Sequence, residues 1–248
     1  TRHFKCKLED GKEVEVKSVR FCSMDNDELA AITYSITPLN FSGNIKFTPY
    51  LDFDVRNQDA NYGDMFWEET SRNVGVKKGF VCAKTKKTNF QVAVAMNYTF
   101  TTDGEDQHIS PYKVDRELYV ENNFESNVDQ GVTYTINKYI SLISSIHHSD
   151  LSLSERAVSR ANKAKEYGFD QLLENHKEAW GNIWRNADIQ IKGDVSAQQA
   201  IRFNIFHLYQ TYTGKNVKLN IGPKGFTGEK YGGATYWDTE AYCLPFFL

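Results

Sequence analysis

The chain has 248 residues, of which 40% are hydrophobic, 25% are charged and 14% are aromatic, and its formal net charge is −3. This length exceeds one average domain and allows two, while the absence of a basic stripe argues against nucleic acid as the main partner. No apolar run approaches the roughly 20 residues that a membrane-spanning helix needs. The high aromatic content suits β-structure and carbohydrate-binding surfaces.

The cysteines and histidines show no metal-binding spacing. Cys6, Cys22, Cys82 and Cys243 form no CxxC pair, and a domain of this size does not need disulfides, so we expect free thiols in a reducing cytoplasm. The pair His147-His148 lies at a segment junction, where we expect it to be solvated. The sequence therefore predicts neither a metal site nor a bound cofactor. Because residue 1 is Thr and not Met, we expect an N-terminus that was processed or truncated.

The first 146 residues are predicted to be strands. Apolar residues alternate with polar ones in four stretches, which indicates one buried and one polar face. Turn signals such as LNFSGN, KKTN and TTDGED separate these stretches, a pattern typical of antiparallel sheets packed as a sandwich. Between Val14 and Phe21 the alternation changes parity, which predicts a bulge. The inward residues of the four stretches are Ile45, Phe47, Leu51, Phe53 and Val55; Phe90, Val92, Val94, Met96, Tyr98 and Phe100; Val114, Leu118 and Val120; and Val132, Tyr134, Ile136, Ile140 and Leu142.

The pattern becomes helical at Ser152. Ser152 and Glu155 have the spacing of a capping box for a helix that runs to about Glu166. Asp170 is the expected cap of a second helix, in which Trp180, Trp184 and His176 fall at packing positions. The strand-like stretch ADIQIKGD follows. Ser196 is then the expected cap of a third helix, which ends near Gly214 and whose broad apolar stripe predicts a deep position in a helical assembly.

These patterns predict an N-terminal β-sandwich domain over residues 1–150, a helical linker over 151–194 and an incomplete helical domain over 195–248. About fifty residues after Ser196 bury little apolar surface by themselves. The final CLPFFL leaves Leu244, Phe246, Phe247 and Leu248 without evident partners. We therefore expect the chain to be a fragment of a longer protein.

The most distinctive stretch is GPKGFTGEKYGGATYWDTE, residues 222–240, in which five glycines precede a tryptophan and two carboxylates. An indole can cover the apolar face of a sugar ring, and a neighbouring carboxylate can accept hydrogen bonds from its hydroxyls, so Trp237 and Asp238 form a candidate sugar-binding pair. The competing interpretation is structural. In it, Asp238 or Thr239 caps a helix, Trp237 belongs to a core and the glycines only reverse the chain.

Three segments together resemble glycoside hydrolase family 65, which contains maltose, trehalose and kojibiose phosphorylases. They are RFCSMDNDELAAITYSITPLNFSGNI, HKEAWGNIWRNADIQIKGD, and the region from Gln199 to Leu248 that includes YGGATYWDTE. Within the family, YGGATYWDTE and LDFDVRNQDANYGDMFWEE look most like the maltose phosphorylases. The trehalose and kojibiose enzymes usually carry a histidine near the position of Ala234.

The resemblance implies a fold and a reaction. The fold is a β-sandwich (supersandwich), a helical linker and an (α/α)6 barrel, of which this chain holds only the truncated start. The reaction is inverting phosphorolysis of an α-1,4-glucoside, with inorganic phosphate as co-substrate and β-glucose 1-phosphate and glucose as products. The resemblance also implies a soluble homodimer.

By the same resemblance, Trp237 and Asp238 line the subsite of the transferred glucosyl unit. Glu240 is a weaker candidate, because a carboxylate at this position also suits a helix N-terminus. Lys230 and Tyr231 are weaker candidates too, as are Lys224 and Phe226 of the same loop. The catalytic acid and the phosphate site lie beyond Leu248, so no catalytic residue is expected in this chain. Asn61-Tyr62-Gly63-Asp64 is either a loop over the active site or a surface turn.

Two rival functions stay open. A hydrolase of the same fold would carry a second carboxylate as base. A non-catalytic carbohydrate-binding sandwich would bind sugar through residues 1–146, and it should present clustered exposed aromatic residues, of which the strict alternation gives no sign.

Overall fold

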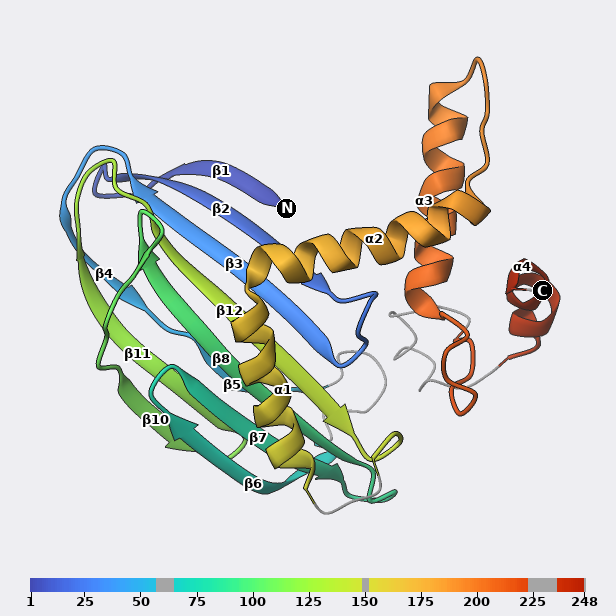
Figure 1. Cartoon of the computed structure of the whole chain (residues 1–248), viewed down its shortest axis with the longest axis horizontal. Coiled ribbons are helices and arrows are strands. Elements are labelled where there is room, and N and C mark those ends of the chain that lie inside the picture. Colours follow the sequence, from blue (N-terminus) through green and yellow to red (C-terminus); the bar gives the residue numbers. More distant parts are fainter. Residues whose placement is uncertain (57–64, 149–151, 223–235, 248) are drawn as a thin grey trace. The chain divides into compact units, whose positions relative to one another are not determined.

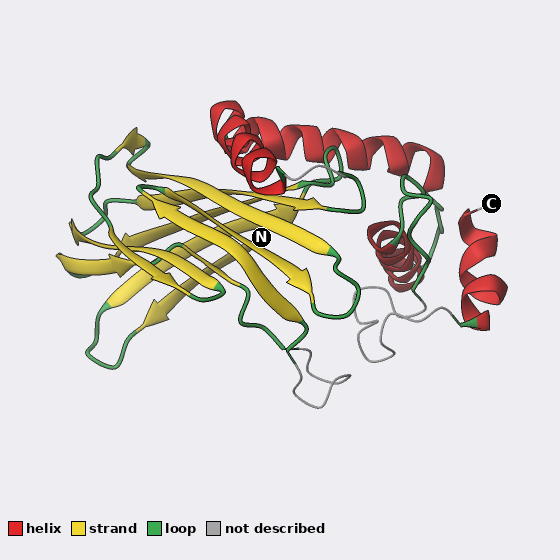
Figure 2. Ribbon diagram, turned by 90° about the horizontal axis from the view of Figure 1, so that it is seen from below, coloured by secondary structure: helices red, strands yellow, loops and turns green. Residues whose placement is uncertain are grey.

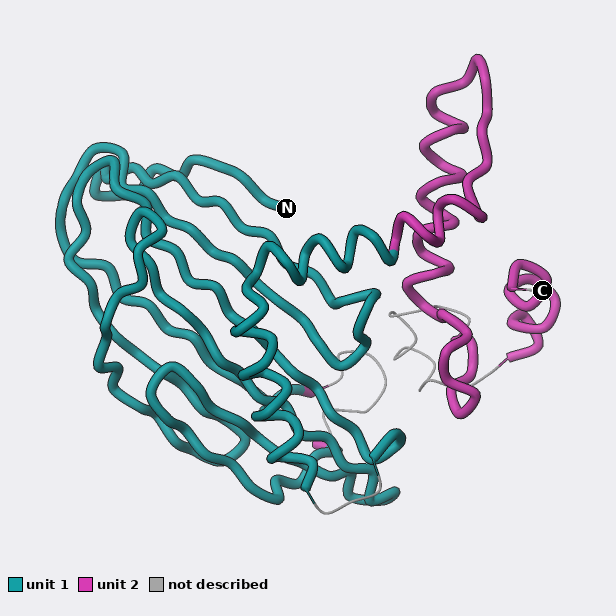
Figure 3. Tube along the Cα trace, in the orientation of Figure 1, with its two compact units in different colours: residues 1–55, 66–179 teal, residues 56–65, 180–248 magenta. Residues whose placement is uncertain are grey.

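The computed structural model describes residues 1–56, 65–148, 152–222 and 236–247. The chain forms two compact units, coloured separately in Figure 3. Unit 1 holds residues 1–55 and 66–179, and unit 2 holds 56–65 and 180–248. Among the described residues, no helix is both long and apolar enough to cross a membrane. The predicted loop at Asn61-Tyr62-Gly63-Asp64 lies outside the described residues.

Unit 1 is a sandwich of two antiparallel sheets with helices against the larger one (Figures 1 and 2). The larger sheet has the order β1-β2-β3-β12-β8-β7-β6, with β9 paired to β8, and the smaller has the order β10-β11-β4, with β5 paired to β11. The predicted sandwich is therefore confirmed. The strands of the larger sheet are β1 (Arg2–Lys7), β2 (Glu13–Cys22), β3 (Leu29–Pro38), β6 (Trp67–Gly75), β7 (Lys78–Thr85), β8 (Gln91–Thr102), β9 (Glu105–Asp106) and β12 (Tyr134–Ser144); those of the smaller are β4 (Gly43–Phe47), β5 (Tyr50–Asp52), β10 (Tyr112–Arg116) and β11 (Tyr119–Val128).

Aromatic rings fill the space between the two sheets. Phe124 of β11 lies 4.9 Å from Phe100 of β8 and 5.4 Å from Phe47 of β4, measured between ring centroids. Each such buried side chain contributes roughly 1.5–3 kcal/mol through the area it removes from water. The hydroxyl of Tyr98 donates to Asn122 Oδ1 at 3.0 Å, so the polar end of this buried ring is satisfied.

The opposite face of the larger sheet is covered by α1 (Leu153–Tyr167) and the first part of α2 (Phe169–Ala187). Ala157 and Ala161 of α1 are fully buried in one cluster with Ala93 and Ala95 of β8. Small side chains on both elements allow the helix to approach the sheet closely. Strand β8 is consequently buried on both faces from Val92 to Tyr98, and the expectation of one polar face is wrong for this strand.

Burial on both faces also explains the change of parity in β2. Val16 is buried on the sandwich side, whereas Val19 and Phe21 pack in the cluster under α2. The pairing of β2 with β3 runs without interruption from Val14↔Pro38 to Cys22↔Ala30, so the predicted bulge does not exist. An irregularity of that kind occurs instead in β6, between Glu69 and Ser71.

Two of the predicted alternating stretches are hairpins or broken strands. The stretch that contains Val114, Leu118 and Val120 is β10 and β11 joined by a turn, in which Leu118 has a φ of 58°. The stretch from Ile45 to Val55 is divided between β4 and β5, and Val55 is exposed. In β12, Tyr134 and Ile136 are buried in the sandwich as expected, but Leu142, which was expected to face inward with them, is half exposed. Toward the end of this strand the buried residues are Tyr139 and Ile143, which point to the other face and pack under the helices.

The starts of the two helices differ in detail from the prediction. Ser152 stands at the N-cap position of α1 as predicted, but its side chain makes no capping hydrogen bond, so the predicted capping box is absent. Gly168, at a φ of 80°, ends α1 by donating its N–H to the Ala164 and Lys165 carbonyls. α2 begins at the next residue, which places Asp170 inside its first turn and not at the cap.

An ion-pair cluster holds α1 to the sheet. Glu28, just before β3, binds His148 Nε2 through one carboxylate oxygen and Arg160 Nη2, at 2.6 Å, through the other. The Glu28 side chain is largely buried, so the cluster joins the end of β12, the start of β3 and α1. The expectation that the His147-His148 pair is solvated is therefore wrong for His148.

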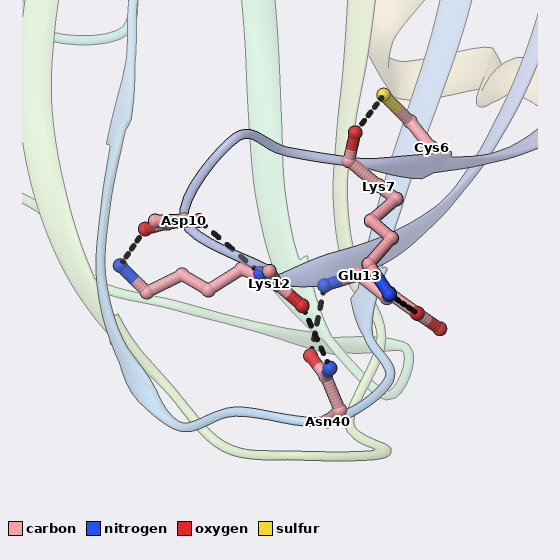
Figure 4. A network of polar contacts seen from close by, with 7 residues as sticks. Cys6, Lys7, Asp10, Lys12, Glu13 and Asn40 are labelled. Atoms are coloured by element: carbon pink, nitrogen blue, oxygen red, sulfur yellow. Dashed lines mark hydrogen bonds and ion pairs between the residues drawn. The ribbon is translucent and has the colours of Figure 1, made fainter.

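A polar network fixes the β1–β2 hairpin to the loop after β3 (Figure 4). The side chain of Asn40 accepts from Glu13 N at 2.8 Å and donates to the Gly11 carbonyl at 3.0 Å. Lys12 also donates to Asp10, at 2.7 Å. Because β1 is an exposed edge strand, these contacts help to hold its register.

The first testable prediction concerns His176 of α2. Its Nδ1 accepts a hydrogen bond from Met24 N at 3.2 Å and its ring lies 4.7 Å from Phe21, so the expected packing role is confirmed. Burial lowers the pKa of His176 below its ordinary value, and the observed bond requires an unprotonated Nδ1. The unfolded chain therefore takes up this proton first as the pH falls. The stability contribution is fully present above about pH 6.5 and is lost as the pH falls through the lowered native pKa.

We expect His176→Gln, which accepts a hydrogen bond but does not titrate, to show less loss of stability between pH 7.5 and 5 than the wild type. Urea unfolding at several pH values measures this. His108→Gln, at an exposed histidine of the same unit, controls for the substitution itself. Parallel pH profiles for His176→Gln and the wild type would contradict the prediction.

Candidate functional site

The candidate sugar-binding segment belongs to unit 2, whose longest helix is α3 (Val195–Thr211). The side chain of Asp194 accepts from Ala197 N at 2.9 Å and caps this helix. The predicted cap, Ser196, is the second residue of α3 and therefore not its cap. Asp was available two residues earlier, and an Asp carboxylate suits the N-terminus of a helix at least as well as a serine hydroxyl.

The predicted strand ADIQIKGD is not a strand. The backbone of this stretch forms hydrogen bonds with the side chain of Gln198 instead of with another strand. Gln198 donates to the Ile189 carbonyl at 2.9 Å and accepts from Ile191 N at 2.7 Å. Asp188 binds Arg202 through two hydrogen bonds of 2.8 and 2.7 Å, and this guanidinium lowers the pKa of Asp188. The segment before α3 is therefore attached to the helix by side chains.

Aromatic contacts hold the helices of unit 2 together. Trp180 lies 5.0 Å from Phe206 and 6.2 Å from Trp184, which confirms the packing role expected for the two tryptophans. Phe246 and Phe247, expected to lack partners, pack against α3 through Tyr209 at 5.2 and 6.2 Å. On α3 only Ile205 is buried, and Phe203 is 61% exposed, so the deep position expected for this helix is not found within the described residues.

Trp237 and Asp238 directly precede a π-helical turn, η2 (Thr239–Cys243), which continues into α4 (Leu244–Phe247). Thr239 anchors the turn. Its hydroxyl donates to the Ile221 carbonyl at 2.9 Å, its N–H donates to the Tyr236 carbonyl at 3.0 Å, and the residue is 4% exposed. Because the anchor takes the inward position, the two residues before it are held at the surface of the segment.

The exposed side of this turn carries two aromatic rings, with the partly buried Asp238 next to them in the chain. Trp237 is 68% exposed and lies 6.1 Å from the ring of Tyr242, which is 71% exposed. Asp238 stands at the N-cap position with helical backbone angles, and its side chain makes no capping hydrogen bond. Within the described residues, Trp237 is thus not enclosed by other side chains and Asp238 does not cap the turn, whereas Thr239, the other cap in the structural interpretation, uses its hydroxyl to bind Ile221. Large exposed aromatic residues beside a carboxylate are able to stack on a sugar ring and bind its hydroxyls.

Tyr242 is the residue of this surface that the sequence did not indicate. It lies five positions after Trp237, a spacing that places two residues on different sides of an α-helix but brings them together across a π-turn. The only signal was its proximity to the WDTE motif. π-Turns occur frequently at functional sites.

The other candidates are placed less favourably or lie elsewhere. Glu240 is exposed in the first turn of η2, where a carboxylate suits the positive end of the helix dipole. Lys230 and Tyr231, as well as Lys224, Phe226 and Ala234, lie outside the described residues. Within the part of the chain that the structure describes, no group of three or more His, Cys, Asp or Glu side chains is arranged to hold a metal ion.

Comparisons with known proteins match almost the whole chain. The family model described as glycosyl hydrolase family 65, N-terminal domain, matches residues 1–183, and the model of the central catalytic domain of the same family matches residues 202–248. The predicted division at residues 150 and 194 stays a prediction.

Among curated proteins, the maltose phosphorylase of Bacillus subtilis (strain 168) is 37% identical over 237 residues, which cover 96% of this chain and 31% of that protein. An α,α-trehalose phosphorylase of Thermoanaerobacter brockii is 34% identical over 258 residues, covering 100% of this chain and 32% of that protein. The chain thus spans about a third of the length of these relatives.

A solved structure described as a candidate kojibiose phosphorylase from the human microbiome superposes with a TM-score of 0.85 at 24% identity, over 99% of this chain and 31% of that one. At this identity the likeness shows the fold. The predicted order of a β-sandwich followed by the start of a helical barrel agrees with it.

The second testable prediction concerns the Thr239 anchor. Thr239→Ala removes the hydrogen bond to Ile221, which is worth about 1 kcal/mol, and we expect the amides of residues 239–243 to exchange with deuterium about fivefold faster. Hydrogen exchange followed by mass spectrometry measures this, and Thr239→Ser, which keeps the hydroxyl, should restore the slow rate. Equal exchange in the alanine and serine variants would show that the hydroxyl does not anchor the turn.

Proposed function

Because the chain belongs to glycosyl hydrolase family 65, we propose that it is the N-terminal part of an inverting glycoside phosphorylase that cleaves maltose. The observation that carries the proposal is the match of both the N-terminal and the central catalytic domain models on one chain. The exposed Trp237, next to an Asp238 that does not serve as a cap, supports a sugar-contacting role for this segment.

The proposed reaction needs no protein carboxylate that acts as a base. A phosphate oxygen attacks the anomeric carbon, the glycosidic C–O bond breaks, and a carboxylic acid gives its proton to the departing glucose oxygen. Phosphate is already anionic, so it takes the role that a base-activated water has in an inverting hydrolase. The acid and the phosphate site are proposed to lie on the central domain beyond residue 248, and the 248-residue chain alone is proposed to be inactive.

Within this reaction, Trp237 and Asp238 are proposed to bind the glucosyl unit that is transferred. The indole provides an apolar wall for the ring, and the carboxylate accepts hydrogen bonds from its hydroxyls. Glu240, Lys230 and Tyr231 are secondary candidates for the same subsite. The surface of Tyr242 extends the aromatic wall, since its ring lies beside that of Trp237.

Maltose is the proposed substrate because the sequence around Trp237 looks like that of maltose phosphorylases and because the maltose phosphorylase relative shares 37% of residues. The trehalose phosphorylase relative, at 34%, makes trehalose the first competitor. The two alternatives to a phosphorylase are a hydrolase of the same fold and a non-catalytic carbohydrate-binding sandwich. We also propose that the whole protein is a homodimer and that it is located in the cytoplasm.

The third testable prediction is the activity itself. The full-length protein, incubated with maltose and inorganic phosphate, should release β-glucose 1-phosphate and glucose in equal amounts, and neither without phosphate. Trehalose and kojibiose serve as competing substrates, and nuclear magnetic resonance identifies the anomer. Release of glucose without phosphate would favour the hydrolase, whereas faster turnover of trehalose or kojibiose would overturn the choice of maltose.

The fourth prediction tests the sugar contact. Asp238→Asn keeps the shape of the side chain but weakens two charge-assisted hydrogen bonds, so we expect kcat/KM to fall roughly 100-fold with unchanged thermal stability. Glu178→Gln is the matched control, because it removes an exposed carboxylate of α2 that is not a candidate for the subsite, and it should leave kcat/KM unchanged. A near-normal Asp238→Asn enzyme would remove Asp238 from the subsite.

A further inference from the structure

Unit 1 carries a groove of about 640 Å³ that the sugar-binding motif does not involve. Its floor is the part of the larger sheet formed by β1, β2, β3 and β12. Its wall is the end of β4 and the Thr48-Pro49-Tyr50 turn that leads into β5. The groove is thus built by the sandwich alone.

The strand register shows which side chains share the floor. One row across the sheet pairs Arg20 with Ile32 and Ile32 with Lys138. Side chains two residues apart on a strand point to the same face, so the next row adds residues of all four strands to that face. This second row is Arg2, Ser18, Tyr34 and Ile136, and a third begins with Phe4 on β1.

Three large aromatic rings line this groove and remain open to solvent. Phe4 is 46% exposed, Tyr34 is 40% exposed and Tyr50 is 48% exposed. They come from β1, β3 and β5, far apart in the sequence. An exposed aromatic cluster in a concavity is a feature of ligand-binding surfaces, since each ring offers an apolar face and the tyrosines also offer a hydroxyl.

The charge of the groove has one sign. Arg2, Arg20, Lys46 and Lys138 line it, no Asp or Glu does, and within the described residues none of the four takes part in an ion pair. Lys138 donates to the Tyr50 carbonyl, and its ammonium lies 5.6 Å from the Tyr50 ring. Burial lowers the pKa of Lys138 to about 8, as expected for a cation whose lost hydration no carboxylate replaces.

The distances across the sheet suit a small anion. Arg20 and Lys138 stand on β2 and β12 with β3 between them, so their backbones are about 10 Å apart. Both side chains are long enough to converge above Ile32 from opposite sides. Tyr34 follows Ile32 on the same face of β3, about 7 Å along the strand, with the Ser18 hydroxyl in its own row.

We propose that this groove binds a phosphorylated hexose, with the phosphate between Arg20 and Lys138 and the sugar ring against Tyr34. Cations without carboxylate partners select the anionic group, since charge-assisted hydrogen bonds to phosphate are strong. The neighbouring aromatic face and hydroxyls select the sugar over phosphate alone. The site rests on the geometry of the sandwich and does not depend on the proposed phosphorolysis.

Calorimetric titration of the full-length protein with glucose 6-phosphate tests the proposal, because this compound is neither substrate nor product of the proposed reaction. We expect Arg20→Met and Lys138→Met each to weaken its binding about tenfold, the effect of one lost charge-assisted hydrogen bond, and Tyr34→Ala to weaken it about fivefold. Lys17→Met removes an exposed cation from the opposite face of β2 and should leave binding unchanged. Phosphorolysis of maltose should stay normal in Arg20→Met.

The remaining outcomes would overturn the proposal. Equal affinity of Arg20→Met, Lys138→Met and the wild type for glucose 6-phosphate would remove the groove as its site. If inorganic phosphate or AMP bound more tightly than glucose 6-phosphate, and the groove variants weakened that binding, the choice of a phosphorylated hexose as ligand would be wrong. Equally tight binding of neutral glucose would show that the phosphate group is not recognised. If another part of the polypeptide fills the groove, glucose 6-phosphate will not bind and the groove variants will lower the melting temperature. An absence of phosphorolysis with intact groove binding would refute the proposed function alone.

Discussion

Burial of both faces of the central strands is the constraint on which the rest of unit 1 depends. β8 and β12 are covered by aromatic rings of the smaller sheet on one side and by the alanines of α1 on the other. A strand enclosed in this way cannot slip by one residue without exchanging large rings for small side chains on each face. The register of the whole larger sheet is therefore fixed from its centre outward.

That register has a consequence toward the β1 edge of the larger sheet. The side chains that would have faced the sandwich core there are Tyr34, Arg20 and Lys138, and they line an open groove instead. The polar network at Gly11 and Asn40 holds the edge hairpin, and with it Arg2 and Phe4, against this face. A packing constraint thus also positions a candidate binding surface.

Unit 2 uses a different device to present its candidate site. The buried hydroxyl of Thr239 bonds to the Ile221 carbonyl, and the π-turn that follows places Tyr242 beside Trp237. The backbone is thus anchored by one small polar residue while the large aromatic residues remain exposed. An arrangement of this kind keeps an apolar aromatic surface available without exposing unpaired backbone groups.

The sequence by itself determined the alternation of the strands, the change to helices near residue 152 and the motif with Trp237 and Asp238, because these are local patterns of polarity and residue type. It also carried the family resemblance. Ser152 occupies the N-cap position expected for it, although its side chain makes no capping hydrogen bond, whereas the cap expected at Ser196 was wrong because Asp194, close by in the chain, is also able to cap and takes that position. The bulge in β2 was wrong because parity alone cannot show that a helix covers the second face. The exposed cluster of Phe4, Tyr34 and Tyr50 was missed for the same kind of reason: each ring is isolated in its own strand. Phe4 and Tyr34 come to one face through the pairing of β1, β2 and β3, and Tyr50 joins them only through the packing of the smaller sheet against the larger.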